Sequence, residues 1–71
     1  MGRTEHAVIT ARLRLADLEG SGNTSRDLPA VRAELERLTR ALLERSLHRA
    51  SILKHARDLH GELDRLADTL G

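Results

Sequence analysis

Two arginines in the second half of the chain are the first candidates for chemistry. Arg45 and Arg49 lie four residues apart, so on a helix they present two guanidinium groups on one face. Such a pair is suited to hold an anion or an acidic partner helix. Two structural roles compete with that one: the long stems can lie along an apolar surface while the heads reach water, or a polar layer can fix helix register. Because charge within a helix is more often structural, we expect one of these two roles.

Three histidines, His48, His55 and His60, are the candidate metal ligands. On one helix His48 and His55 lie about 10 Å apart along the axis, too far for a single ion. His55 and His60 point to different sides, although in a parallel dimer they would face each other across the two chains. The chain has no cysteine and no His-Glu-x-x-His or Glu-x-x-His motif. We therefore predict neither a metal site nor a cofactor.

Arg49 and His55 also have an Arg-x5-His spacing. This seven-residue segment resembles one that some helical ribonucleases place in a dimer cleft, and the resemblance implies a nuclease-like helical enzyme acting through these two residues. No serine or threonine has an evident base, and Gly20 to Gly22 lack the Lys-Ser/Thr pair of a nucleotide loop. We expect a protein that is not an enzyme and keep the nuclease-like enzyme as an alternative hypothesis.

A heptad pattern sets the elements that would position these side chains. From Leu28 to Leu70 the spacing alternates between three and four residues, and every position is apolar except Arg45 and Arg49. Such a pattern gives a helix one narrow apolar seam that other helices must cover. The seam is the predicted interface, and it consists of Leu28, Val31, Leu35, Leu38, Leu42, Arg45, Arg49, Ile52, Ala56, Leu59, Leu63, Leu66 and Leu70.

The chain is expected to form one all-α domain over residues 1–71. Thr4 is suited to cap a short helix over residues 4–19, and the Gly/Ser-rich segment 20–27 forms a loop. Asp27 and Pro29 mark the start of a long helix over residues 28–70. The alternative is a three-helix bundle, in which the long helix breaks near residues 46–51. The continuous heptad phase favours the unbroken helix.

The expected helix lengths argue for a partner. A helix over residues 28–70 would be roughly 60 Å long and the first helix only about 23 Å, at 1.5 Å per residue. The short helix would then leave much of the seam uncovered. We therefore predict a coiled-coil homodimer, in which the short helices fold back to thicken one end into a helical bundle.

Composition limits the function classes. The 71 residues include no cysteine and no aromatic residue, and the net charge is +1. No apolar stretch is long enough to cross a membrane, so we expect a cytoplasmic protein without a membrane partner. A basic belt over residues 37–57 contains six basic residues and only one acid, Glu44. This belt makes a nucleic-acid-associated regulator an alternative function.

The function that the sequence favours is protein–protein interaction. We expect a small dimeric adaptor, regulator or assembly subunit that binds itself and another protein through the leucine-rich seam. Arg45 and Arg49 would act as its specificity element.

Overall fold

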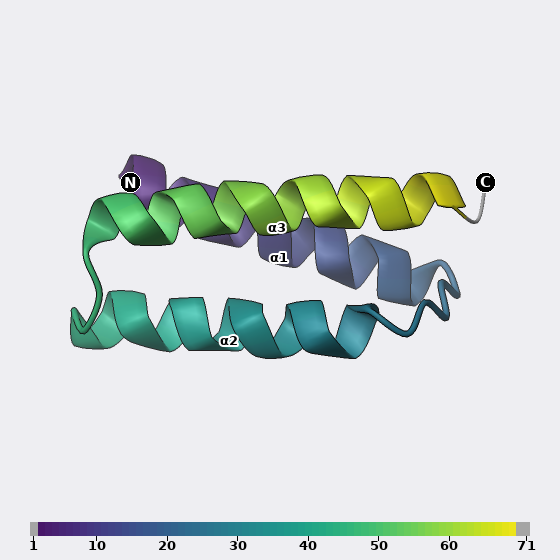
Figure 1. Ribbon diagram of the computed structural model, residues 1–71, viewed down its shortest axis with the longest axis horizontal. Helices are drawn as coiled ribbons and strands as arrows, with labels where there is room; N and C mark the ends of the chain where they lie inside the picture. Colours follow the sequence, from purple (N-terminus) through teal and green to yellow (C-terminus); the bar gives the residue numbers. More distant parts are fainter. Residues whose placement is uncertain (1, 70–71) are drawn as a thin grey trace.

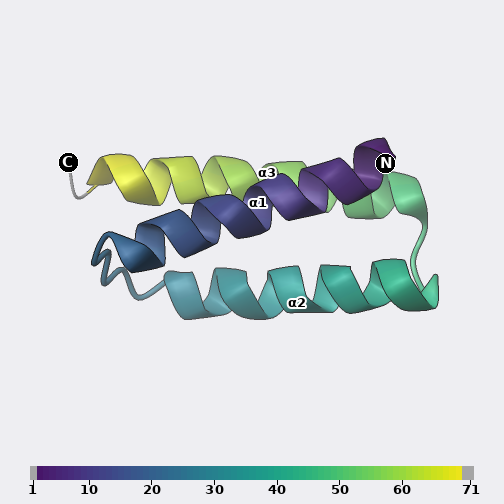
Figure 2. The same cartoon turned by 180° about the vertical axis from the view of Figure 1, so that it is seen from behind.

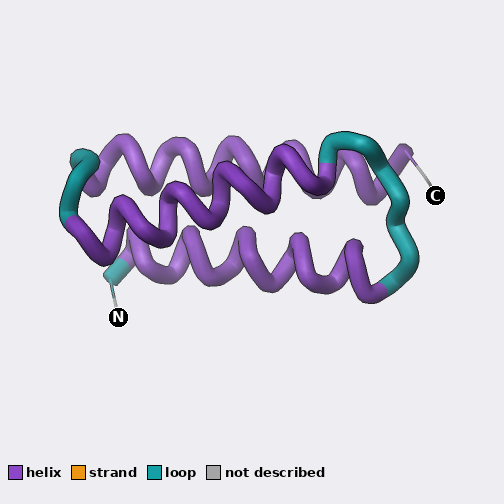
Figure 3. Tube along the Cα trace, turned by 90° about the horizontal axis from the view of Figure 1, so that it is seen from below, coloured by secondary structure: helices purple, strands orange, loops and turns teal. Residues whose placement is uncertain are grey.

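The computed structural model describes residues 2–69 as three helices. They are α1 (Arg3–Gly20), α2 (Leu28–Glu44) and α3 (Arg49–Thr69). α1 and α3 run in the same direction, and α2 lies antiparallel to both (Figures 1 and 2). The two connections lie at opposite ends of the bundle (Figure 3). The prediction of an all-α fold is confirmed.

α1 buries one apolar face. Val8, Ala11, Leu15 and Leu18 are buried on one face, as the three-four pattern requires. The helix begins at Arg3, however, so the prediction that Thr4 caps it is wrong. Thr4 lies within the first turn and is itself buried, and no side chain caps the helix at Gly2.

The first connection matches the predicted loop closely. Gly22 has a φ of 86°, a conformation that glycine adopts at no steric cost. The N–H of Asn23 donates to the carbonyl of Leu18 at 3.0 Å, and the Asn23 side chain accepts from the N–H of Ser25 at 2.9 Å. α2 then begins at Leu28. Asp27 precedes it as predicted, although its side chain makes no capping hydrogen bond.

The prediction of one helix over residues 28–70 is wrong, because the chain turns at residues 45–48. Arg45 takes a left-handed conformation, with φ 55° and ψ 36°. The N–H groups of Arg45 and Ser46 both donate to the carbonyl of Ala41, the latter at 3.1 Å. This geometry ends many helices. The alternative prediction, a three-helix bundle broken near 46–51, is confirmed, with the break starting one residue earlier.

The turn forms because it lets the chain cover its own seam. Leu35 on α2 and Leu63 on α3 are 1% and 0% exposed. Fully burying a leucine contributes about 1.5–3 kcal/mol, whereas a left-handed non-glycine residue costs about 1–2 kcal/mol. A few buried side chains therefore outweigh the turn. The three helices have similar lengths of 18, 17 and 21 residues, so the expected length mismatch is absent.

The core runs along the axis of the bundle and is aliphatic. α1 packs more extensively on α3 than on α2. Fully buried alanines, Ala11 on α1 and Ala56 on α3, allow this close approach, since a methyl group takes little space between two helices. The bundle measures 36 × 18 × 16 Å.

Candidate functional site

Most of the predicted interface lies in the core of the single chain. The apolar seam positions that are buried there are Leu28, Val31, Leu35, Leu38, Ile52, Ala56, Leu63 and Leu66. Leu42 and Leu59 are partly buried against that core, and Leu70 lies outside the described residues. Helices of the same chain therefore cover the seam that was expected to need a second chain. The homodimer itself stays a prediction.

The structure brings four of the predicted residues together at the end of the bundle where α2 passes into α3. They line a hollow of about 310 Å³, here called the corner hollow. Its apolar part comes from buried Ala41 and Ile52, partly buried Leu42 and the exposed Leu47 of the turn. Its polar part comes from Arg45 and Arg49. The full lining is Ala41, Leu42, Arg45, Leu47, Arg49 and Ile52.

The two arginines of the corner hollow differ in their partners. Arg49 donates to both carboxylate oxygens of Glu5 on α1, at 2.6 and 2.7 Å. This side-chain hydrogen bond is the main reason that the pKa of Glu5 lies below its ordinary value, and it raises the pKa of Arg49. Arg45 is exposed and makes no ion pair with any residue from 2 to 69. Its guanidinium is therefore available to an external carboxylate.

Exposed leucines flank this end of the bundle. Leu43 on α2 is 79% exposed and Leu47 in the turn is 47% exposed. Together with Ala50 and Leu53 they form a second apolar stripe in the sequence, separate from the main seam. Ala50 is exposed and Leu53 half-buried, so the stripe lies mostly outside the core.

The residues of the nuclease-like alternative diverge. Arg49 contacts Glu5 on α1, whereas His55 Nε2 lies 3.4 Å from Glu34 Oε2 on α2. His48 is exposed in the turn, and His60 Nδ1 lies 3.5 Å from Asp64 Oδ2. Within residues 2–69, no three histidine, aspartate or glutamate side chains gather closely enough to hold a metal ion.

The six members of the basic belt are divided among α2, the turn and α3. Three of its members have carboxylate partners within the chain: Arg37 with Glu34, Arg49 with Glu5, and Lys54 with Asp58. The remaining members, Arg40, Arg45 and Arg57, make no ion pair with another described residue. Arg40 and Arg45 lie on α2 and at its end, whereas Arg57 lies on α3.

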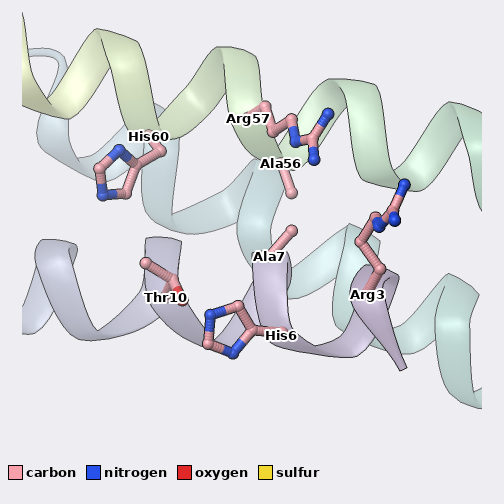
Figure 4. Close-up of a pocket in the computed structure, with 7 residues that line it drawn as sticks. All are labelled: Arg3, His6, Ala7, Thr10, Ala56, Arg57 and His60. Carbon is pink, nitrogen blue, oxygen red and sulfur yellow. The ribbon is translucent and has the colours of Figure 1, made fainter. Parts of the chain in front are cut away.

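Sequence reasoning missed a second hollow, which lies between α1 and α3 and is here called the cationic groove. Its volume is about 250 Å³. Figure 4 shows Ala7 and Ala56 facing each other across the two helices, with basic side chains around them. The lining consists of Arg3, His6, Ala7, Thr10, Ala56, Arg57 and His60. The spacing of Arg3, His6 and Thr10 places them on one face of α1, a signal that could have been found from the sequence.

No helix in the described part of the chain combines the length and the apolarity that crossing a membrane requires. The chain matches no protein-family model, and no curated protein or solved structure matches it.

Proposed function

We propose that this chain is a small helical protein–protein interaction module and that the corner hollow is its docking site. The partner is an amphipathic segment of another protein, in which an apolar side chain lies next to one or more carboxylates. One observation carries the proposal: an apolar hollow has, at its rim, an arginine that lacks a carboxylate partner among residues 2–69. Such a module would serve as an adaptor, a regulator or an assembly subunit.

The apolar part of the hollow supplies the driving force for binding. Leu47 is 47% exposed beside the partly buried Leu42, so a side chain inserted between them removes apolar surface from water. Complete burial of a leucine contributes about 1.5–3 kcal/mol. A partner that covers Leu47 and fills the hollow with a leucine of its own gains a large part of that amount on each side of the contact.

The charges around the hollow select the partner. Arg45, His48 and Arg49 lie in or near the turn, with Glu44 as the nearby acid in the sequence. Since Glu5 already accepts both hydrogen bonds from Arg49, Arg45 is the group that can receive a carboxylate in the fork geometry that arginine favours. A basic segment would meet like charges here. The charge complementarity therefore favours an acidic partner.

The backbone of Arg45 supports a role for its side chain. Its φ of 55° falls in the region that glycine occupies without strain. Glycine is the commonest residue at this position after a helix, and arginine there costs about 1–2 kcal/mol. Because the core does not use the exposed Arg45 side chain, docking gives this arginine a purpose that folding does not.

The test uses matched variants of the full chain. Tagged protein retains partners from a lysate of its source cells, and each partner is then measured as a purified component. We expect Leu47→Ser and Arg45→Glu to weaken binding by about tenfold or more, the equivalent of about 1.4 kcal/mol. The controls Leu13→Ser and Arg40→Glu change a more exposed leucine on α1 and an arginine outside the hollow, and we expect less than a twofold change. Added salt should weaken the wild-type complex.

Three outcomes would contradict the proposal. One is a partner whose binding falls equally with the control variants. Another is a partner whose contact segment, mapped by truncation, carries no acidic residue. The third is a second copy of this chain as the occupant, shown by a dimer mass in sedimentation equilibrium that Leu47→Ser reduces to the monomer mass.

A further inference from the structure

We infer that the cationic groove between α1 and α3 binds a small phosphate-bearing anion. The ligand is either free inorganic phosphate or the phosphate group of a small ester, since both present the same tetrahedral set of acceptor oxygens. The groove uses other residues than the corner hollow, so this inference does not rest on the proposed docking function.

The charge of the groove is the first support. Arg3, His6, Arg57 and His60 line it, and no carboxylate does. Two other hollows between the helices carry acids beside their bases. The α2–α3 hollow contains Glu34, Asp58 and Glu62, and the α1–α2 hollow contains Glu19 and Glu36. The cationic groove is thus set apart from these two hollows by having basic side chains with no balancing acid in its lining.

The ion pairs around the groove leave its arginines available. Neither Arg3 nor Arg57 makes an ion pair with a residue in the described part of the chain. The acids in nearby sequence positions have other partners: Glu5 accepts from Arg49, and Asp58 pairs with Lys54. Asp64, which lies 3.5 Å from His60, also accepts a hydrogen bond from Arg14 at 3.1 Å. Arginine side chains without a carboxylate partner can donate to an anion that enters the groove.

The shape and donors of the groove fit a phosphate. Ala7 and Ala56 leave room where the helices approach each other, and the groups with N–H or O–H donors surround them (Figure 4). Arginine donates in a planar fork, and the Thr10 hydroxyl and the imidazoles supply further donors. A phosphate accepts from several directions at once, whereas a carboxylate has only two oxygens.

Other ligand classes fit less well. A divalent cation would meet two arginines and, within residues 2–69, no cluster of metal-ligating side chains. Single-stranded nucleic acid is held largely by stacking of bases on aromatic side chains, and this chain has none. A groove of about 250 Å³ has room for a small anion and is small for a polymer.

The experiment is a titration of the ¹⁵N-labelled full chain with inorganic phosphate or with glycerol phosphate, followed by NMR at constant ionic strength. Sodium chloride is the control for general screening. We expect saturable shifts at the amides of residues 3–10 and 56–60, and Arg57→Gln should weaken binding by about tenfold. Arg40→Gln, which removes an exposed arginine on α2, should leave the affinity within twofold.

The two probes distinguish the source of the phosphate. Tighter binding of glycerol phosphate would support a phosphate ester as the ligand, and tighter binding of inorganic phosphate would support the free anion. Shifts that do not saturate, shifts equal to those in sodium chloride, or an equal loss with Arg40→Gln would overturn the inference. Circular dichroism of Arg57→Gln establishes that the variant is folded, so that a loss of binding is assigned to the missing guanidinium.

Discussion

The α1–α2 loop and the α2–α3 turn both reverse the chain, but they do so with different residues. The first follows Gly20, the last residue of α1, and takes a positive φ of 86° at Gly22. The second contains no glycine or proline and takes a positive φ of 55° at Arg45. The first connection places glycine at the position with positive φ, where glycine has no steric cost. The second connection places an arginine in the same kind of backbone conformation.

The difference shows where the information for each reversal lies. Glycine and asparagine make the first loop favourable from local sequence alone. The turn at residues 45–48 is instead stabilised from a distance, by the leucines that α2 and α3 bury when they fold together. It is also the connection that carries the corner hollow, so the less favourable backbone coincides with the proposed docking site.

The largest expected effect tests whether side chains that one chain buries in its own core stabilise the turn at residues 45–48. Leu63 is 0% exposed, and Leu63→Asp would place a carboxylate among aliphatic side chains. A domain of this size is stable by roughly 4–10 kcal/mol, and an unpaired buried charge costs several kcal/mol. We expect the variant to lose most of its helical signal in far-ultraviolet circular dichroism at 25 °C.

Leu13→Asp is the matched control for that experiment, because Leu13 is 66% exposed on α1. It should change the stability by no more than about 0.5 kcal/mol. If Leu63→Asp kept its helical signal while the mass in solution fell by half, the seam would be an interface between chains and the two-connection fold would be wrong.

The second prediction changes the residue with positive φ in each of the two connections. Gly22→Ala puts a Cβ on a backbone with positive φ and should destabilise the chain by about 1 kcal/mol. Arg45→Gly removes such a Cβ and should stabilise it by about 0.5–1 kcal/mol. Each kcal/mol corresponds to about 4–8 °C in the melting temperature, which differential scanning calorimetry resolves.

We expect the free energy of unfolding to fall in Gly22→Ala and to rise in Arg45→Gly. Gly61→Ala provides the reference, since Gly61 lies inside α3, has open space where a Cβ would lie and should gain stability from the change. If Arg45→Gly destabilised the chain as much as Gly22→Ala does, the Arg45 side chain would stabilise the fold. Folding alone would then explain why arginine occupies this position, and the backbone would no longer support a docking role.

Much of the fold could be predicted from the sequence because apolar spacing fixes which face of each helix is buried. Leu28, Leu35 and Leu66 lie in the core as members of that pattern. The pattern could not fix the direction of the chain after Glu44. Every helix of a bundle buries a stripe with the same three-four spacing, so a turn of suitable length keeps the phase. The unbroken phase therefore did not distinguish one long helix from two.

The candidate sites were less predictable, since they depend on which helices meet. The sequence singled out Arg45 and Arg49, and both residues line the corner hollow. It could not show that Glu5, more than forty residues away, occupies Arg49 and leaves Arg45 available. The cationic groove brings Arg3 of α1 and Arg57 of α3 together. A local sequence pattern cannot predict this, because it does not show which faces of two helices meet.

The third prediction tests the tolerance of each connection to length. A Gly-Ser-Gly insertion between Ser46 and Leu47 should cost roughly 0.5 kcal/mol, because closing a loop becomes only slowly less favourable with length. The same insertion between Thr24 and Ser25 should cost a similar amount. Within α2, between Ala33 and Glu34, it should cost several times more, as it displaces one half of the buried face. Urea denaturation measures all three, and a cost above about 2 kcal/mol at residue 46 would indicate a continuous helix there.

The smallest expected effect concerns the ion pair between Arg49, which follows the second connection, and Glu5 on α1. Glu5 accepts two hydrogen bonds from Arg49, and these hold the pKa of Glu5 below its ordinary value. A carboxyl with a lowered folded-state pKa adds stability that is fully present above its unfolded-state pKa. That stability is lost as the pH falls through the folded-state pKa.

The difference in stability between the wild type and Glu5→Gln should therefore be present at pH 7 and vanish in acid. Both partners are partly exposed, with 57% of the Arg49 side chain and 34% of the Glu5 side chain accessible, so salt should reduce the difference at pH 7. Urea denaturation at pH 7 and at pH 3, each at two salt concentrations, measures it. Glu36→Gln is a suitable control, because Glu36 lies 3.9 Å from Arg32 of its own helix and ties no two helices together. A difference that persisted unchanged at pH 3 would mean that Glu5 stabilises the bundle through packing rather than through its charge, and the second connection would then depend on apolar contacts alone.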